Sequence, residues 1–222
     1  RDDIPLAPTY TEPLFRPKES VNLNLKYFGT DGFRGEANTV LTADHAYKIG
    51  RFLGWYYSSE LSGCNKANYR PQIVIGKDTR RSSYMLEYSI VAGITASGAD
   101  AYMLHVTTTP SVSYVGRTEG FDCGIMISAS HNPFYDNGIK LINRNGQKME
   151  AVIEEKIEKY IDGEIEEIPF AKREEIGCAT DFSVGRNRYI GYLQCLVRHA
   201  LPRGFLHVRY QSLTFLLSLY GY

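Results

Sequence analysis

Apolar positions along the chain follow two spacings, one typical of buried strands and one typical of amphipathic helices. Short apolar runs at residues 73–75, 101–104 and 123–127 predict strands. Three other stretches place their packed positions three or four residues apart, which predicts helices. These positions are Ala46, Ile49, Leu53 and Tyr56, then Leu86, Ile90, Gly93 and Ser97, and then Ile153, Ile157, Tyr160 and Ile161. Strands that alternate with helices of this length predict an α/β fold, a three-layer α/β/α domain with a mixed sheet.

Several local features refine this prediction. Thr42 is expected to cap the first helix, and Ser82 or Ser83 to cap the second. Gly93 is expected to let the second helix approach the sheet closely. Residues 107–110, which read Thr-Thr-Thr-Pro, are expected to form a simple β-turn.

The two ends of the chain differ in composition from its middle. Four of the nine prolines lie before residue 18, so residues 1–25 are expected to form a disordered leader. A helix is expected to begin at Gly185, within a C-terminal part that spans residues 182–222. Two interpretations of the tail after about His199 stay open. It is either an element of a core that is not fully present or a sequence that is not native to the fold, for instance from a shifted reading frame.

The apolar run at 123–127 leads into a segment with several reactive groups. Residues 128–133 read Ser-Ala-Ser-His-Asn-Pro, and residues 136–140 read Asp-Asn-Gly-Ile-Lys. The proline and the Asp-Asn-Gly turn predict a loop, and a serine there, near amide donors and a lysine, could carry a phosphoryl group. A capped turn without chemistry is the alternative. In an extended segment Ser130 and His131 would point to opposite sides, which argues against His131 as a base for Ser130.

Two further segments combine cations with glycines or with a strand end. Residues 27–35 contain three glycines and Arg34, so backbone amides and a guanidinium could approach an anion; a plain glycine-rich turn is the alternative. Neither a P-loop nor a dinucleotide-binding motif is present. Lys77 and Arg80 follow the apolar run at 73–75, at the carboxyl end of a predicted strand, where open α/β sheets bind ligands.

The three segments together resemble the α-D-phosphohexomutase superfamily, and most closely its phosphoglucosamine mutase branch. The matching stretches are Gly-Thr-Asp-Gly-Phe-Arg-Gly at 29–35, Ile-Gly-Lys-Asp-Thr-Arg at 75–80, and Ile-Ser-Ala-Ser-His-Asn-Pro with Asp-Asn-Gly-Ile-Lys at 127–140. Each motif is modestly specific, but three in the same order and spacing are highly specific. The resemblance implies that residues 26–181 form the first domain of a phosphohexomutase, which carries its phosphoserine loop.

The resemblance also implies roles for individual residues. Ser130 matches the serine that is phosphorylated in the family, and Arg34 matches the arginine beside the phosphoserine. Lys140 matches the lysine assigned to proton transfer or phosphate stabilisation. We therefore expect a catalytic group of Ser130, Lys140, Arg34 and His131, and a phosphate- or substrate-binding group of Asn132, Lys77 and Arg80.

The implied reaction interconverts glucosamine 6-phosphate and glucosamine 1-phosphate through the phosphoserine and a bisphosphate intermediate. Its implied cofactors are Mg²⁺ and a primer of the glucosamine 1,6-bisphosphate type. In the family, Mg²⁺ is bound by the serine phosphate and by three aspartates of a D-G-D-x-D-R loop in a second domain. This chain contains no D-G-D, and its last carboxylate side chain is that of Asp181. Ser130, through its phosphate, is thus the metal ligand expected here.

Composition limits the partners. Lys plus Arg and Asp plus Glu both count 25, so no global positive field is present to attract nucleic acid, and no apolar run reaches the ~20 residues of a membrane span. The four cysteines, Cys64, Cys123, Cys178 and Cys195, form no C-x-x-C pair, which predicts reduced thiols and a cytoplasmic location. We expect a phosphosugar substrate and packing against later domains of the same enzyme.

The sequence therefore predicts an isomerase of the phosphoglucosamine mutase type, with the chain as a fragment that has little or no activity alone. The form Ile-Ser-Ala-Ser-His at residues 127–131 favours the glucosamine branch. The alternatives are a phosphomannomutase or phosphoglucomutase of the same superfamily, and a non-catalytic phosphosugar-binding fragment. Turnover that depends on Ser130 would distinguish the enzyme from the binding fragment.

Overall fold

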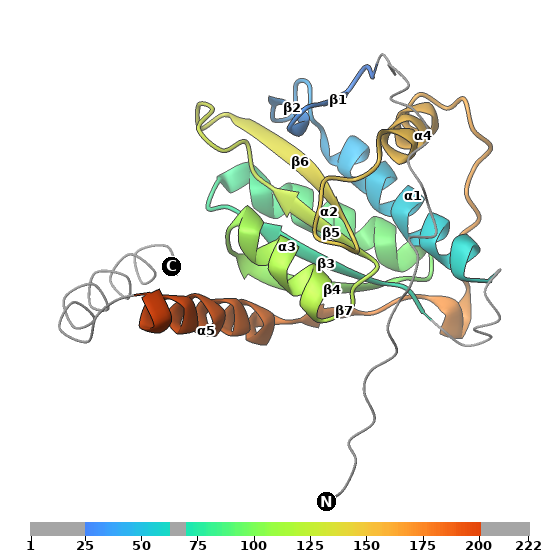
Figure 1. The fold of residues 1–222 in the computed structure, drawn as a ribbon. Coiled ribbons are helices and arrows are strands. Elements are labelled where there is room, and N and C mark those ends of the chain that lie inside the picture. The colour runs from blue at the N-terminus through green and yellow to red at the C-terminus, as the bar shows by residue number, and fades with distance from the viewer. Residues whose placement is uncertain (1–24, 63–69, 201–222) are drawn as a thin grey trace, which may run out of the picture.

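The computed structural model describes residues 25–62 and 70–200 (Figure 1). Except for Leu25, the predicted leader lies outside the described residues, as do Cys64 and residues 201–222 of the predicted tail. The strands are β1 (Phe28–Gly29), β2 (Gly32–Glu36), β3 (Gln72–Lys77), β4 (Asp100–Val106), β5 (Cys123–Ile127), β6 (Asp136–Asn143) and β7 (Ala179–Asp181). The helices are α1 (Ala43–Ser62), α2 (Arg81–Ala96), α3 (Thr109–Thr118), α4 (Ala151–Ile161) and α5 (Ser183–Ala200), with a short 3₁₀ turn at Arg173–Glu175.

The strands form one seven-stranded mixed sheet in the order β1-β2-β6-β5-β3-β4-β7. The strands β5, β3, β4 and β7 are parallel to their neighbours within that group, while β1, β2, β6 and β5 are joined by antiparallel pairs. The parallel strands are linked through helices, as crossover connections require. The predicted mixed sheet is confirmed.

Helices cover both faces of the sheet (Figure 1). Along β5, Cys123, Ile125 and Ile127 pack into the core beneath α1, α2 and α4, whereas Met126 packs into the second core beneath α3. This alternation follows from the two-residue period of a strand whose faces are both buried. All five residues of β5 are buried, so the strand reads as a continuous apolar run. The predicted α/β/α layering is confirmed.

The helices α1 and α2 cross at two glycines, and this corrects one prediction. A Cβ on Gly93 would come within 2.7 Å of the Arg51 backbone nitrogen and would also clash with the Tyr47 carbonyl oxygen; both belong to α1. A Cβ on Gly50 of α1 would likewise clash with the Ile90 carbonyl of α2. Gly93 therefore allows a close approach between two helices and not, as predicted, between a helix and the sheet.

The start of α1 agrees with the sequence. Thr42 Oγ1 accepts a hydrogen bond from the His45 amide at 3.3 Å, and His45 Nδ1 accepts one from the Thr42 amide at 3.3 Å. The predicted cap is confirmed, and the reciprocal bond satisfies a second amide of the first turn.

Two other local predictions were wrong. Residues 109–110 do not form a simple turn but begin α3, with Pro110 in its first turn, where the fixed φ of proline suits a helix. The N-cap of α2 is Arg80, so both serines predicted as caps lie inside the helix. The Asp78 carboxylate organises this turn instead: it accepts hydrogen bonds from the Arg80 amide at 3.1 Å and from the Ser83 hydroxyl at 2.6 Å.

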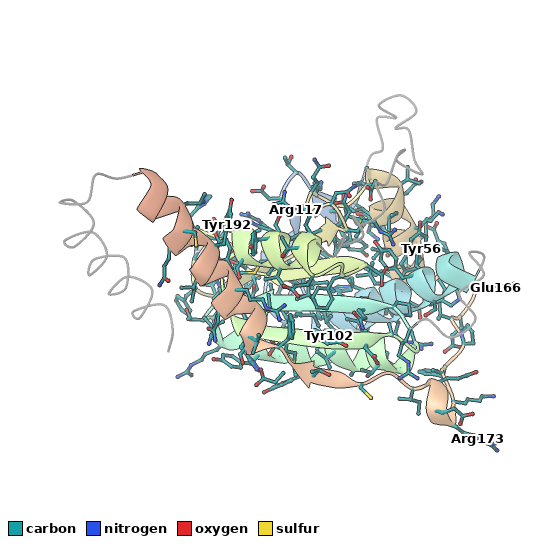
Figure 2. All side chains as sticks on the ribbon, turned by 60° about the horizontal axis from the view of Figure 1, so that its bottom comes forward. Tyr56, Tyr102, Arg117, Glu166, Arg173 and Tyr192 are labelled. Carbon is teal, nitrogen blue, oxygen red and sulfur yellow. The ribbon has the colours of Figure 1, made fainter. Side chains whose placement is uncertain are left out.

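The last helix, α5, lies on the α3 side of the sheet and begins two residues before the predicted start. Tyr192 stacks on Tyr114 of α3 with ring centroids 4.5 Å apart, and the Phe182 ring centroid lies 5.6 Å from that of Tyr102 of β4. Tyr192 and Tyr102 are labelled in Figure 2. Within residues 25–62 and 70–200, none of the helices is both long and apolar enough to cross a membrane.

Candidate active site

The candidate site lies at the carboxyl edge of two neighbouring parallel strands. Lys77, the last residue of β3, is the register partner of Ile127, the last residue of β5. The segments that leave these strands, residues 78–80 and 128–135, therefore emerge side by side. The Asp78 amide also donates a hydrogen bond to the Ile127 carbonyl at 3.0 Å, which extends the pairing by one residue.

Ser130 is exposed and has a left-handed backbone with φ of 58°. Its amide donates to Ser128 Oγ at 3.0 Å, and its Oγ lies 3.4 Å from His131 Nδ1. The prediction that the two side chains point to opposite sides is wrong, because the segment turns at Ser130 and is not extended. The imidazole can therefore exchange a proton with the serine hydroxyl across a long hydrogen bond.

Arg80 organises the serine loop, which we define as residues 128–136. Its Nη2 donates to the carbonyl oxygens of Ser130 at 3.0 Å and of Asn132 at 2.9 Å. Its Nη1 donates to the carbonyl of Asp136 at 3.0 Å and to that of Pro133. These loop residues lie 50–56 positions after Arg80 in the sequence and come close to it because β5 pairs with β3.

The other end of the serine loop is fixed by Asn137, which is fully buried. Its Nδ2 donates to the hydroxyls of Ser82 and Ser83 at 2.8 and 2.9 Å. The Gly138 carbonyl accepts from the Ser128 amide at 2.8 Å, and a Cβ on Gly138 would come within 2.8 Å of the Ser128 carbonyl oxygen. The Asn137 amide thus ties this segment to α2, and the absence of a side chain at Gly138 lets Ser128 approach β6 closely.

Arg34 approaches the serine loop from β2. Its Nη1 lies 3.2 Å from Asn132 Oδ1 and 3.4 Å from the Ala129 carbonyl, and its Nη2 forms an ion pair with Asp31 at 2.9 Å. Its Nε is buried and has no acceptor among the described residues. The guanidinium therefore borders the serine loop with two of its five N–H groups, that of Nε and one of Nη2, lacking an acceptor among the described residues. The structure brings Ser130, His131, Asn132, Arg34 and Arg80 together around one loop.

Lys140 lies on the same face of the sheet as Arg34. Arg34 pairs with Gly138 of β6, and Lys140 is two residues further along that strand, so both side chains project from the sheet on the side that α3 covers. Lys140 lines a cavity of about 460 Å³ that is also bordered by Thr30, Asp31, Thr109, Pro110 and Glu154. It forms no hydrogen bond or ion pair with the residues that the structure describes. Its ammonium is therefore available to a ligand in this cavity.

Glu154 of α4 is a buried carboxylate at the far side of the same cavity. Burial raises the pKa of Glu154, and the nearby Lys148 ammonium, 3.2 Å from Glu154 Oε2, opposes this shift. Oε1 has no hydrogen-bond partner among the described residues. Neither Glu154 nor Asp31 was predicted from the sequence. For Glu154 the available signal was its place directly after Ile153, at the start of the apolar face of a predicted helix.

Lys77 is the predicted binding residue that the structure does not bring to the site. Its side chain leaves β3 on the face of Ile73 and Ile75, toward α2, and is buried against Glu87, with which it forms an ion pair. Its Nζ also lies 4.4 Å from the centre of the Tyr84 ring. The ammonium thus neutralises a carboxylate in the interior and is not exposed to a ligand.

A metal site is not complete within the described residues, because no three His, Cys, Asp or Glu side chains converge there. Asp31 and Asp136 are two carboxylates at or beside the serine loop, and both are already engaged: Asp31 pairs with Arg34, and Asp136 accepts a hydrogen bond from the Asn132 side-chain amide. A hard divalent cation binds six or more oxygens. The part of the chain described here could offer such an ion a phosphate on Ser130 but not a carboxylate cage.

Comparison with known proteins places this geometry in a family. Residues 25–167 match the family described as phosphoglucomutase/phosphomannomutase, alpha/beta/alpha domain I. Among curated relatives, a phosphoglucosamine mutase of Lachnospira eligens is 71% identical over 171 residues, which cover 77% of this chain and 37% of that protein. One of Lachnoclostridium phytofermentans is 68% identical and is covered to 36%. The chain thus spans little more than a third of the length of these relatives.

Solved structures show the same fold. A phosphoglucomutase/phosphomannomutase family protein of Burkholderia thailandensis superimposes with a TM-score of 0.60 at 22% identity, covering 76% of this chain and 35% of that one. A protein described as a putative phosphomannomutase of Thermus thermophilus gives a TM-score of 0.57 at 21% identity. At these identities the likeness establishes the architecture alone.

Proposed function

Because this chain belongs to the phosphoglucomutase/phosphomannomutase family, we propose that it is the phosphoserine-bearing first domain of a phosphoglucosamine mutase. The observation that carries the proposal is the placement of Ser130. It is exposed, lies on a loop that hydrogen bonds of Arg80 and Asn137 hold in position, and lies beside the Arg34 guanidinium, which has donors without acceptors among the described residues. The proposed domain spans residues 26–181 and so includes β7, the edge strand of the sheet. The names of the relatives favour glucosamine phosphates as substrates over mannose or glucose phosphates.

In the proposed reaction, Ser130 Oγ carries the phosphoryl group. The free hydroxyl oxygen of a hexosamine monophosphate attacks the phosphorus, the Oγ–P bond breaks, and the hydroxyl proton passes to a nearby base. Return of the sugar's other phosphoryl group to Oγ regenerates the phosphoserine and releases the isomeric monophosphate. A bisphosphate of the same sugar would prime an unphosphorylated Ser130.

The roles of the surrounding residues follow from their positions. Arg34 would stabilise the charge of the phosphoryl oxygens, because one N–H of Nη2 has no acceptor among the described residues and a guanidinium suits phosphate. Lys140, whose ammonium has no partner among the described residues, would stabilise the transferring group or donate a proton to Ser130 Oγ as its bond to phosphorus breaks. His131 would exchange a proton with Ser130 across the 3.4 Å separation. Asn132 would keep Arg34 in place.

Mg²⁺ is proposed as the metal of the intact enzyme, where it would neutralise charge on the phosphate. From this chain it would contact the phosphate on Ser130, and its carboxylate ligands would come from outside the described residues. A cytoplasmic location is also part of the proposal. It is supported by the free thiols of Cys123, Cys178 and Cys195, which suit a reducing compartment.

A chimera tests the proposal. The segment 26–196 of this chain replaces the matching segment of the Lachnospira eligens phosphoglucosamine mutase, and turnover of glucosamine 1-phosphate is followed in a coupled assay with Mg²⁺ and a bisphosphate primer. We expect turnover in the chimera and its loss in the Ser130→Ala variant. Turnover that survives Ser130→Ala would refute the phosphoserine role. Ser89→Ala on α2, whose hydroxyl donates only to the Met85 carbonyl of the same helix, is the control and is expected to retain turnover.

A non-catalytic phosphosugar-binding role is the second candidate, because no three His, Cys, Asp or Glu side chains converge to hold a metal within the described part of the chain. The 222-residue chain, assayed by itself, is expected to give little or no turnover. Binding of a phosphosugar without turnover, both alone and in the chimera, would favour this second role. A panel of glucose, mannose and glucosamine phosphates is included to identify the sugar.

A further inference from the structure

Arg80 has no donor left for a substrate. A guanidinium carries five N–H groups. Nε donates to Asp78 Oδ2 at 3.0 Å, and each of the two terminal nitrogens donates to two carbonyls of the serine loop. These five acceptors account for every donor. The sequence-based expectation that Arg80 binds phosphate therefore conflicts with its geometry, since a phosphate contact would break a bond to the loop.

The bonds of Arg80 coincide with the strained part of the loop. Ser130 is one of four non-glycine residues with positive φ among the described residues, and a left-handed residue with a side chain costs roughly 1–2 kcal/mol. Its own carbonyl is one of the four that accept a hydrogen bond from the Arg80 guanidinium. Bonds to a charged donor are stronger than neutral ones, so Arg80 can offset this cost. Without it, the carbonyls of Ser130, Asn132 and Asp136 would lose this donor, and the Pro133 carbonyl would keep only the Asp136 amide, at 3.1 Å.

Arg80 is itself held in position. The Asp78 carboxylate binds Nε of Arg80 and also the Arg80 amide and the Ser83 hydroxyl. The Asp78 amide continues the pairing of β3 with β5. The orientation of the guanidinium is thus set by the sheet and by the first turn of α2, both of which are rigid elements.

We propose that Arg80 is a positioning residue, which fixes the backbone of the serine loop so that Ser130 Oγ is held in one place for phosphoryl transfer. Its catalytic part rests on the proposed function, while its structural part does not. Lysine cannot replace it, because an ammonium has three donors in no fixed plane and cannot bridge four carbonyls. The neighbouring Arg81 is exposed and serves as a matched control.

The structural part is tested on the 222-residue chain by hydrogen exchange followed by mass spectrometry. In Arg80→Lys, peptides covering residues 128–137 are expected to exchange about tenfold or more faster, while those of β5 and α1 stay unchanged. Arg81→Lys is expected to match the parent throughout. Unchanged exchange of residues 128–137 in Arg80→Lys would overturn the proposal. Faster exchange over the whole chain would also overturn it, because the role would then be general stability.

The catalytic part is tested in the chimera described above. Displacing a reacting atom by about 1 Å can cost on the order of 100-fold in rate, so Arg80→Lys is expected to lower kcat by about that factor and to leave KM within about twofold. If Arg80 bound substrate phosphate instead, KM would rise with kcat retained, and the proposal would fail. Ser130→Ala separates the two hypotheses: if it abolishes turnover while Arg80→Lys does not lower kcat, the positioning role alone is refuted.

Asp78→Asn provides a second, milder variant if Arg80→Lys does not fold. It keeps the guanidinium but weakens the charge-assisted bond that orients it. The expected outcome has the same direction and a smaller size: faster exchange of residues 128–137 and a kcat lowered by about threefold to tenfold with little change in KM. A variant that folds and leaves both unchanged would count against the proposal.

Discussion

Glu158 of α4 fixes the segment that leads into the glycine-rich hairpin of β1 and β2. Its buried carboxylate accepts three backbone hydrogen bonds, from the amides of Tyr27 and Phe28 to Oε1 at 2.7 Å each and from the amide of Lys26 to Oε2 at 2.8 Å. Phe28 in turn packs edge-to-face on Phe33, next to Arg34. The substitution Glu158→Gln keeps the size of the side chain and removes the charge and one acceptor.

The cost of Glu158→Gln can be worked out from these contacts. Whichever way the new amide turns, its NH₂ faces at least one backbone N–H that had an acceptor. The best orientation keeps the two bonds to Oε1, each weaker by about 1 kcal/mol once the acceptor is neutral, and leaves the Lys26 amide unpaired at about 1 kcal/mol or more. We expect the free energy of unfolding to fall by about 3 kcal/mol.

Urea unfolding of the 222-residue chain, followed by circular dichroism at neutral pH, measures this change. Glu155→Gln on the same helix is the control: Glu155 is partly exposed and forms only an i,i+4 ion pair with Lys159 at 2.9 Å, which is worth about 0.3–0.5 kcal/mol. A Glu158→Gln variant within about 0.5 kcal/mol of this control would refute the reasoning, since three charge-assisted bonds would then contribute no more than one surface pair.

Three further outcomes follow from the packing and the titratable groups. Gly93→Ala is expected to lower the free energy of unfolding by about 3 kcal/mol or more in the same urea experiment, because the new Cβ meets the α1 backbone. Gly191→Ala on α5, with open space around it, is the control and is expected to be neutral or to stabilise by up to about 1 kcal/mol. Equal effects of the two substitutions would contradict the close crossing of α1 and α2. Burial raises the pKa of the Cys123 thiol, so iodoacetamide at about pH 8 is expected to label Cys178 and to spare Cys123 in the folded chain, and equal labelling by mass spectrometry would contradict this. Burial also raises the pKa of Glu154 above its ordinary value of 4.5, so near and above that pH the folded state binds more protons than the unfolded state. The contribution of Glu154 to the free energy of unfolding therefore falls as the pH rises from 4.5 through the raised pKa. The free energy of unfolding of Glu154→Gln minus that of the parent is therefore expected to increase between about pH 4 and pH 7, and a constant difference would show that the shift is absent.

The layered fold could be predicted because its signals are local and strong. The runs at β3 and β5 are continuously apolar, and α1, α2 and α4 show a clear helical period, so their existence follows from the sequence. The short helix α3 was missed because its start reads as a turn and its N-cap, Thr108, makes no side-chain capping bond. Only the packing of Val112 and Val115 onto the sheet makes this segment helical in preference to a turn.

The conformation of Ser130 could not be predicted, because the bond of its amide to Ser128 is local but its other stabilising contact is distant in sequence. A left-handed serine is intrinsically unfavourable, and it is stabilised here by Arg80, fifty residues earlier. That contact exists because β5 pairs with β3, a pairing that strand patterns do not specify. The identity of the serine was therefore readable from the motif, while its distance to His131 required the tertiary structure.

Lys77 and Arg80 show why the same charge at the same strand end has two outcomes. Both follow the apolar part of β3, and both were predicted to bind phosphate. Lys77 continues the alternation of Ile73 and Ile75 and so points toward α2. There Glu87 stands beside Leu86 on the buried side of the helix, and a carboxylate at such a position requires a cation, since burying it unpaired would cost several kcal/mol. That requirement was visible in the sequence. An acidic residue on the packed face of a helix predicts that a nearby lysine forms a buried ion pair with it and is not available to a ligand.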